Sequence, residues 1–208
     1  MTIFHWICII GFIVCLSACF YFMLKILMSG APVDHAQSKG EIRPAIVYSF
    51  TKAMSPAKKE TAFKHLPTYT GGLLYHMGTF LGFITLALIF FKVSLPLWLT
   101  YLIAGLLLVS AISGIAILIK RIVTPKVRNL SNPDDYISNS LVSIFHLLVA
   151  ATLLLPLIEP VLLVYAAILF LYIPVGKLRH TVYFFTSRIH LAIFYGRRGV
   201  WPIKRREI

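Results

Sequence analysis

The fold of this chain is decided by residues 71–119, GGLLYHMGTFLGFITLALIFFKVSLPLWLTYLIAGLLLVSAISGIAILI. The stretch contains two apolar runs, 71–91 and 95–119. Each run is long enough to cross the hydrocarbon core of a membrane, which takes about 20 helical residues. Only residues 92–94 separate the runs. Because so short a link joins antiparallel neighbours, the stretch predicts a hairpin of two transmembrane helices.

Three further apolar runs extend this pattern outward, at about 3–27, 138–157 and 160–176. The last two are joined by the tight turn Ile158-Glu159-Pro160, which predicts a second hairpin. With 59% hydrophobic and 13% charged residues, the 208-residue chain is too apolar for a soluble domain. The sequence therefore predicts an all-α integral membrane protein, a single membrane domain over 1–208 built on a bundle of five transmembrane helices.

The basic residues lie almost entirely on one side of these spans. All of the 20 Lys and Arg except Lys92 fall within 25–64, 120–128 and 177–206, which share one face of the membrane if there are five spans. The positive-inside rule makes that face the cytoplasm, so we expect the N-terminus outside, the C-terminus in the cytoplasm, and a multi-pass protein of the cell inner membrane. This topology and contact with anionic lipid explain the net charge of +13 without nucleic acid.

Two histidines are placed near the cytoplasmic ends of two different spans. His76 lies about one and a half turns into the second span, roughly 8 Å deep. His180 lies just past the fifth span, and that helix would have to continue through Gly176 to bring His180 to a similar level. Two such histidines can hold a haem iron between two helices, so the pair predicts axial ligands. The alternative is that each imidazole is only a polar tip at the headgroup level.

The other histidines leave several roles open. His146, in the fourth span, is an alternative axial ligand, a donor at a haem edge, part of a quinone pocket, or an interhelical hydrogen-bonding residue. His65 and His190 fall in loop or interfacial sequence, where solvated roles are expected unless one of them ligates a haem. His5, at the outer end of the first span, has no evident partner. Small residues that would let a macrocycle or a neighbouring helix approach the second span are Gly71, Gly72, Gly78 and Gly82.

The tail 181–208 alternates aromatic and arginine residues. This pattern predicts an interfacial amphipathic helix on the membrane surface, with an aromatic belt or a docking surface for a cytoplasmic subunit as alternatives. None of the seven acidic residues lies within a predicted span, so a small transporter or proton pump lacks the carboxylate path that it would need. No nucleophile, phosphate-loop or metal-binding motif of a stand-alone enzyme is present.

Three short motifs resemble those of the gamma subunit of respiratory nitrate reductase and of the related membrane cytochromes of heterodisulfide-reductase-type complexes. The motifs are LYHMG at 74–78, RNLSNPDDY at 128–136 and IPVGKLRH at 173–180. With the five-helix plan, the resemblance covers roughly residues 70–180. It implies two histidines on helix two and two on helix five that hold two stacked haems. It also implies electron exchange between a menaquinone-type quinone and a cytoplasmic iron–sulfur subunit.

The resemblance assigns His76 and His180 to the cytoplasmic-side haem. The outer-haem positions fall near Leu86 and Leu162, and leucine cannot ligate iron, so one haem b is expected. The resemblance thereby implies that the chain is a haem b membrane-anchor subunit of a multi-subunit respiratory oxidoreductase, rather than a stand-alone enzyme. The complex would also include a cytoplasmic subunit and could include further membrane subunits. A haem-free anchor that only docks a partner complex is the alternative.

The same resemblance suggests residues around the haem and the quinone. Arg179, with Lys177 beside it, is expected to pair with the haem propionates. Tyr75, His146, Arg179 and the loop around His65 are candidates for a quinone pocket on the cytoplasmic side.

Overall fold

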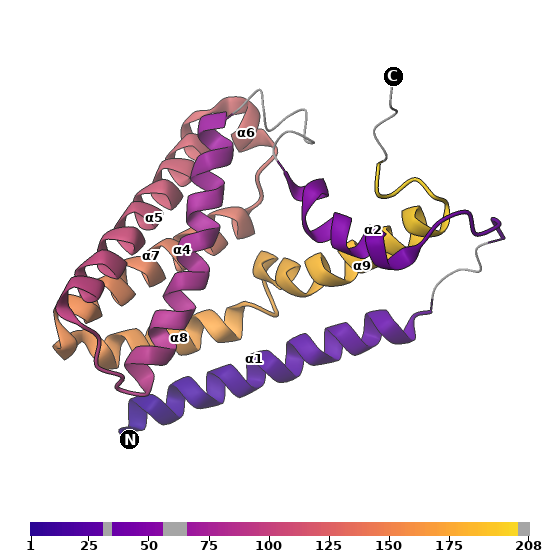
Figure 1. Ribbon diagram of the computed structural model, residues 1–208. Helices are drawn as coiled ribbons and strands as arrows, with labels where there is room; N and C mark the ends of the chain where they lie inside the picture. The colour runs from indigo at the N-terminus through magenta and orange to yellow at the C-terminus, as the bar shows by residue number, and fades with distance from the viewer. Residues whose placement is uncertain (31–34, 56–65, 204–208) are drawn as a thin grey trace. The chain divides into compact units, whose positions relative to one another are not determined.

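The computed structural model describes residues 1–30, 35–55 and 66–203, and these residues form helices and connecting turns without a strand (Figure 1). The α-helices are α1 (Ile3–Met28), α2 (Ile42–Phe50), α4 (Leu66–Phe90), α5 (Leu97–Val123), α6 (Pro125–Asn129), α7 (Pro133–Leu154), α8 (Glu159–Tyr172) and α9 (His180–Arg197). Short 3-10 helices are η1 (Lys52–Met54), η3 (Pro156–Ile158) and η4 (Lys177–Arg179). The prediction of an all-helical chain is confirmed for the described residues.

Four of the described helices, α1, α4, α5 and α7, are long and apolar enough to cross a membrane. A fifth span is counted if the segments Pro156–Tyr172 and Lys177–Arg197 are taken together as one broken span. The chain is therefore a multi-pass membrane protein. Large apolar side chains such as Phe80, Leu106 and Ile112 remain exposed on these helices, as expected where lipid is the solvent.

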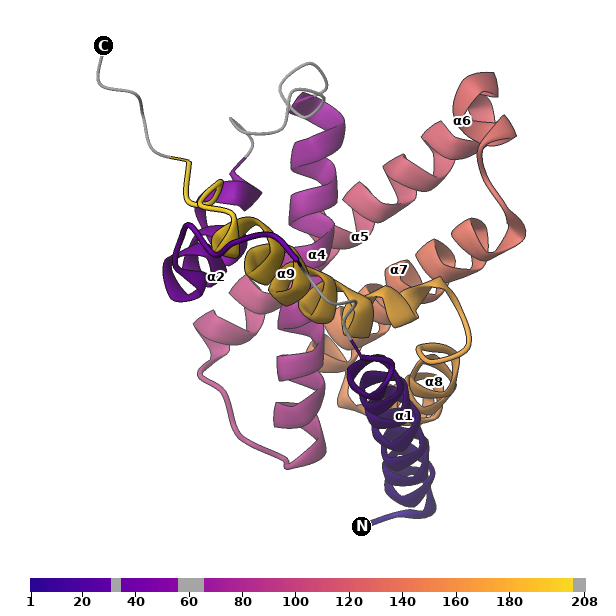
Figure 2. The ribbon, with the colours of Figure 1, turned by 90° about the vertical axis from the view of Figure 1, so that its right-hand side faces the viewer.

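The described chain divides into two compact units. The first, here called unit 1, comprises Met1–Ser17 and Leu66–Leu178. Within it α5 packs against both α4 and α7, α4 also contacts α7, and α7 packs on α8 (Figures 1 and 2). Fully buried apolar side chains at the centre of unit 1 are Leu107, Ala111, Phe145, Val149, Leu162, Leu163, Ala166 and Leu169. Ala111 and Ala166 among these are small, which lets the helix axes approach closely.

The N-terminal half of α1 packs against α8 within unit 1 (Figure 2). Gly11 faces Ala167 so closely that a Cβ on the glycine would lie 3.0 Å from the Cα of the alanine. The rings of Phe12 and Phe170 meet edge to face, with centroids 5.2 Å apart. This combination of a small-residue contact and an aromatic pair brings two helices together that are far apart in the sequence.

The start of α7 lies five residues earlier than the apolar run indicates. The Asn132 side chain accepts a hydrogen bond from the Asp135 backbone N–H, and the Asp135 carboxylate accepts one from the Asn132 N–H, both at 3.0 Å. This reciprocal capping box satisfies two backbone donors that the first turn leaves open. Pro133, at the first helical position, has no N–H to satisfy. Polar capping, rather than hydrophobicity, therefore sets this boundary.

The fifth predicted span does not continue as a helix through Gly176, which was the condition for bringing His180 to the level of His76. The helix α8 ends at Tyr172, and the backbone N–H groups of Val175 and Gly176 both donate to the Tyr172 carbonyl, at 3.1 and 2.9 Å. Pro174 explains the break, because it cannot donate the next helical hydrogen bond and its ring clashes with the preceding turn. His180 instead begins a separate helix, α9.

Unit 2 comprises Ala18–His65 and Arg179–Ile208, of which 31–34, 56–65 and 204–208 are not described. Its helices α2 and α9 lie side by side (Figures 1 and 2). The Ser49 hydroxyl donates to the Arg188 carbonyl at 3.0 Å, and the Lys39 N–H donates to the Arg197 carbonyl at 2.7 Å. The tail, for which an interfacial amphipathic helix was predicted, thus contributes a helix, α9, that is paired with a helix from the long first loop.

The sequence did not predict the helix α2, which lies in the long loop between the first two predicted spans. Pro44 is the third residue of α2, within the first turn, where a proline costs no hydrogen bond. The buried Ala45 lies against Gly196 of α9, and the buried Tyr48 packs on Trp201 with ring centroids 5.4 Å apart. Packing against α9 therefore stabilises a helix that is too short to be stable alone.

Candidate functional site: a polar core between three membrane helices

A histidine lies at the centre of the packed core of unit 1. His146, on α7, has no exposed surface. Its Nδ1 is 3.1 Å from the Ser110 hydroxyl of α5, and its Nε2 is 3.1 Å from the Thr79 hydroxyl of α4. An axial ligand must direct one ring nitrogen at the iron. Because both nitrogens have hydroxyl partners, the geometry supports the interhelical hydrogen-bonding role for His146.

Tyr75 extends this polar core toward the start of α7. Its ring meets His146 edge to face, with centroids 5.2 Å apart. Its hydroxyl donates to the Asn139 carbonyl at 2.9 Å and accepts a hydrogen bond from the Ser143 hydroxyl at 3.4 Å. The structure thus brings together Tyr75 and His146, two of the residues predicted for a quinone pocket, inside the interface of α4, α5 and α7.

Glycines allow these three helices to approach one another. A Cβ on Gly78 would overlap the side chain of Ser110, and a Cβ on Gly82 would lie 2.9 Å from the Phe145 ring. A Cβ on Gly114 would overlap the Tyr75 ring. Gly78 and Gly82 therefore admit a neighbouring helix, the second of the two uses that the sequence left open. Gly72, by contrast, has no atom within 4 Å of the position its Cβ would take.

His76 lies on a different face of α4 from the polar core. Its side chain is exposed, and the nearby Leu73, Met77 and Phe80 are 52%, 60% and 61% exposed. The Tyr75 and His76 rings are 6.3 Å apart at their centroids. An ionisable imidazole thus occupies an apolar outer face of a membrane-spanning helix.

The predicted partner of His76 belongs to the other unit. His180 is the first residue of α9 and is exposed, as is Arg179 just before it. Because His76 and His180 fall in different units, their pairing stays a prediction. His190 is also exposed on α9, and His65 lies outside the described residues.

A buried carboxylate joins three helix ends of unit 1. Asp135 is 7% exposed, and its Oδ2 lies 3.4 Å from Arg121 Nη1. Its Oδ1 forms an ion pair with Lys177 Nζ. These two ion pairs connect the ends of α5 and η4 to the capped start of α7. Hydrogen bonds between oppositely charged groups are stronger than those between neutral groups, so the shared carboxylate helps to hold the three ends together. Lys177 therefore forms an ion pair with Asp135, and the pairing of Arg179 with haem propionates stays a prediction.

The opposite end of unit 1 holds a second buried polar contact. His5 is 3% exposed, its Nε2 lies 3.3 Å from Glu159 Oε1, and its Nδ1 lies 2.9 Å from the Thr2 hydroxyl. The expectation that His5 has no evident partner is wrong. The sequence carried a usable signal, because the predicted topology already put His5 and Glu159 at the same outer end of the bundle.

A surface pocket of about 310 Å³ lies at this same end. Its polar lining consists of Lys92, Thr100, Thr152 and Glu159, and Leu88, Ile89, Val93, Leu95, Leu153 and Pro156 complete it. Neither Tyr75 nor His146 lines it.

The functional residues that the sequence missed are the hydroxyl groups around His146. Asn139, Ser143 and His146 recur at helical spacing on α7, and that polar stripe within an apolar span was a readable signal. Thr79 and Ser110 carried no comparable signal. The site can hold and exchange a proton at His146, and the exposed imidazole of His76 can ligate a metal centre.

Comparison of the chain with protein-family models, with curated proteins and with solved structures gives no match.

Proposed function

We propose that the chain is the haem b-carrying membrane subunit of a multi-subunit respiratory oxidoreductase. The proposal is carried by the exposed imidazole of His76 on an apolar face of α4. An ionisable group in a membrane helix is costly and normally faces the bundle interior. A bound group that covers this face would offset the cost, and imidazole is a common axial ligand of haem iron.

The residues around His76 fit a flat apolar macrocycle. Gly72 lies one turn before His76, and the space that its Cβ would occupy is open. Phe80 lies one turn after it and is exposed. His180 is the proposed second ligand and Arg179 the proposed partner of the propionates. When bound, the haem supplies one-electron transfer, while the chain supplies ligands, orientation and an apolar surrounding.

The proposed partners are a menaquinone-type quinone, a cytoplasmic iron–sulfur subunit and anionic lipid. Support for a docking surface comes from α9, where Phe185 and Ile189 are 53% and 41% exposed. Arg198, at the end of the same helix, lies over the Phe194 ring, with its guanidinium carbon 3.7 Å from the ring centroid. Exposed apolar and cationic groups on one helix suit a membrane surface or an acidic partner.

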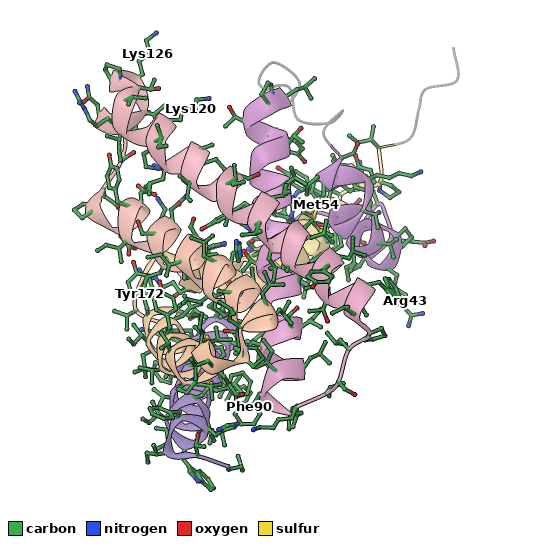
Figure 3. All side chains as sticks on the ribbon, turned by 90° about the vertical axis from the view of Figure 1, so that its left-hand side faces the viewer. Arg43, Met54, Phe90, Lys120, Lys126 and Tyr172 are labelled. Carbon is green, nitrogen blue, oxygen red and sulfur yellow. The ribbon has the colours of Figure 1, made fainter. Side chains whose placement is uncertain are left out.

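The proposed orientation has its support in the distribution of charge over unit 1. Lys120 and Lys126 lie at one end and Phe90 at the opposite end (Figure 3). Arg121 and Lys177 meet at Asp135 near the Lys120 end, whereas Lys92 follows Phe90. We propose that the Lys120 end faces the cytoplasm of a bacterial-type inner membrane, with the N-terminus outside.

Cysteine labelling in intact cells tests this orientation. In a chain whose three cysteines are replaced by alanine, Val93→Cys is expected to react with a membrane-impermeant maleimide from outside. Lys126→Cys is expected to react only after the cells are broken, because its end of unit 1 faces the cytoplasm. The cysteine-free chain is the control for background labelling. The reverse labelling pattern would contradict the proposed orientation.

A reduced-minus-oxidised absorbance spectrum of the purified protein tests the haem. Dithionite reduction is expected to produce the Soret and alpha-band changes of a b-type cytochrome, with one haem per chain. Two haems per chain would contradict the assignment of Leu86 and Leu162 as positions without a ligand. A chain without any band change is a haem-free anchor.

A further inference from the structure

We propose that His146 is a proton-binding site inside the membrane bundle, and that its hydroxyl neighbours accommodate both its neutral and its charged form. The two hydroxyl groups share one further acceptor. Thr79 Oγ1 lies 2.8 Å and Ser110 Oγ lies 3.3 Å from the backbone carbonyl of Tyr75. Each hydroxyl therefore contacts both His146 and the same carbonyl oxygen.

Thr79 determines which nitrogen of the neutral ring carries the hydrogen. Its hydroxyl has one hydrogen and donates it to the Tyr75 carbonyl, the bond that a threonine commonly makes to the preceding helical turn. The Thr79 oxygen then faces His146 Nε2 as an acceptor, so Nε2 is the protonated nitrogen. His146 Nδ1 is left as an acceptor, and the Ser110 hydroxyl donates to it.

Charging the ring requires only the Ser110 hydroxyl to rotate. When Nδ1 takes a proton, Ser110 turns its hydrogen to the Tyr75 carbonyl and accepts a hydrogen bond from Nδ1. Both ring nitrogens and both hydroxyl hydrogens keep a partner in either state, without a backbone movement. A buried network that stays satisfied in two protonation states avoids the desolvation cost of an unpaired group.

Among the described residues, no charged side chain contacts the His146 ring. Charged residues of α4, α5, α7 and α8 occur only near helix ends, and they are Lys120, Arg121, Asp134, Asp135 and Glu159. The other titratable groups on these helices are His76, Tyr101 and Tyr136, together with Tyr69 and Tyr172 near helix ends. Two further tyrosines, Tyr75 and Tyr165, lie nearer to the polar core. The Tyr75 ring contacts His146, and the Tyr165 hydroxyl donates to the Leu141 carbonyl at 2.9 Å. An uncompensated charge is costly here, so the ring is expected to stay neutral until negative charge arrives nearby.

The source of that charge rests on the proposed function. The Tyr75 ring has its centroid 6.3 Å from that of His76 and 5.2 Å from that of His146. A cofactor held by His76 would gain one negative charge when a reduced quinone or another donor gives it one electron, and Nδ1 of His146 would then take up one proton from solvent. The added negative and positive charges balance, so the net charge of the bundle does not change. Opposite charges attract strongly over such distances in a low dielectric.

Nitrogen-15 magnetic resonance of histidine-labelled protein tests the hydrogen-bond assignment without reference to haem. The His146 signal, identified by its loss in His146→Gln, is expected to be that of the Nε2–H tautomer. Thr79→Val removes the acceptor of that hydrogen and is expected to switch the ring to the Nδ1–H tautomer. Thr85→Val is the matched control, because Thr85 is buried on the same helix and bonds only the Leu81 carbonyl. An Nδ1–H ring in the wild type, or an unchanged ring in Thr79→Val, would overturn the assignment.

A redox titration at several pH values tests the coupling. In the wild type, the ratio of reduced to oxidised haem at a fixed potential is expected to fall about tenfold per pH unit, as one proton per electron requires. In His146→Gln the haem stays bound, and the ratio is expected to change less than about twofold per pH unit. A haem band with equal pH dependence in both proteins would overturn the coupling. A wild type without a haem band would instead overturn the proposed function and the coupling with it, while the tautomer result stands by itself.

Discussion

Alanine in place of His76 is expected to abolish haem binding. Removing an axial ligand deletes one of the two bonds that the protein would make to the haem iron, and even changes to a residue that only hydrogen-bonds a ligand weaken metal sites by about 10- to 100-fold. The haem-to-protein ratio should therefore fall below about a tenth of the wild-type value. His180→Ala is expected to give the same loss, because the proposed iron has one ligand from α4 and one from the start of α9. The measurement is the pyridine haemochrome absorbance per chain after purification.

Two matched histidine variants make this result interpretable. His190→Ala changes another exposed histidine of α9 and is expected to leave the haem content unchanged. His146→Gln alters the buried histidine of α7, whose ring nitrogens face hydroxyl groups, and it should also retain haem. Haem retained in both His76→Ala and His180→Ala would refute this ligand pair. Haem lost in His76→Ala and His190→Ala but retained in His180→Ala would move the second ligand to His190.

Alanine in place of Gly78 is expected to destabilise unit 1 by about 3 kcal/mol, the upper part of the usual range for overpacking a core. The added Cβ would overlap both Oγ and Cβ of Ser110, which is a short side chain on a helix and has nowhere to move. The helices α4 and α5 would have to separate, and the Ser110 bond to His146 would be lost. The measurement is unfolding of the purified protein in mixed detergent micelles, followed by circular dichroism.

Gly72→Ala is the control on the same helix. No atom lies within 4 Å of the position of its Cβ, so its only effect is the better helix propensity of alanine, worth up to about 1 kcal/mol. In the double variant Gly78→Ala with Ser110→Gly, removing the Ser110 side chain makes room for the added Cβ, and part of the lost stability is expected to be recovered. Equal stability of Gly78→Ala and Gly72→Ala would show that α4 and α5 are not in contact at Gly78.

Hydrophobicity alone located four long helices, because a helix in lipid must satisfy its own backbone and so needs a continuous apolar run. The boundaries required finer signals. The capping box of Asn132 and Asp135 was readable in the sequence and would have placed the start of α7 correctly. Pro174 was also visible, yet a proline near the end of a span is compatible with either a kink or a stop. Only the packed structure distinguishes the two.

The polar core was harder to predict because its partners come from three helices. His146 was recognisable as a costly residue, but its role depends on whether Ser110 and Thr79 face it. That depends on the rotation of α5 and α4 about their axes, which Gly78 and Gly82 set through contact. Apolar spans with residues of similar size on all faces do not specify this rotation in their sequence pattern. The role of His76 is a different case, because it depends on a bound group rather than on packing.

The contact between α1 and α8 has a consequence for biosynthesis. Gly11 and Phe12 of α1 pack on Ala167 and Phe170 of α8, and three membrane helices are made between these two. The ribosome therefore delivers α1 long before its packing partner exists. Until then α1 lacks this contact with α8, and its own backbone hydrogen bonds keep it helical in the lipid. The packing of α1 on α8 is therefore complete only after most of the chain has been made.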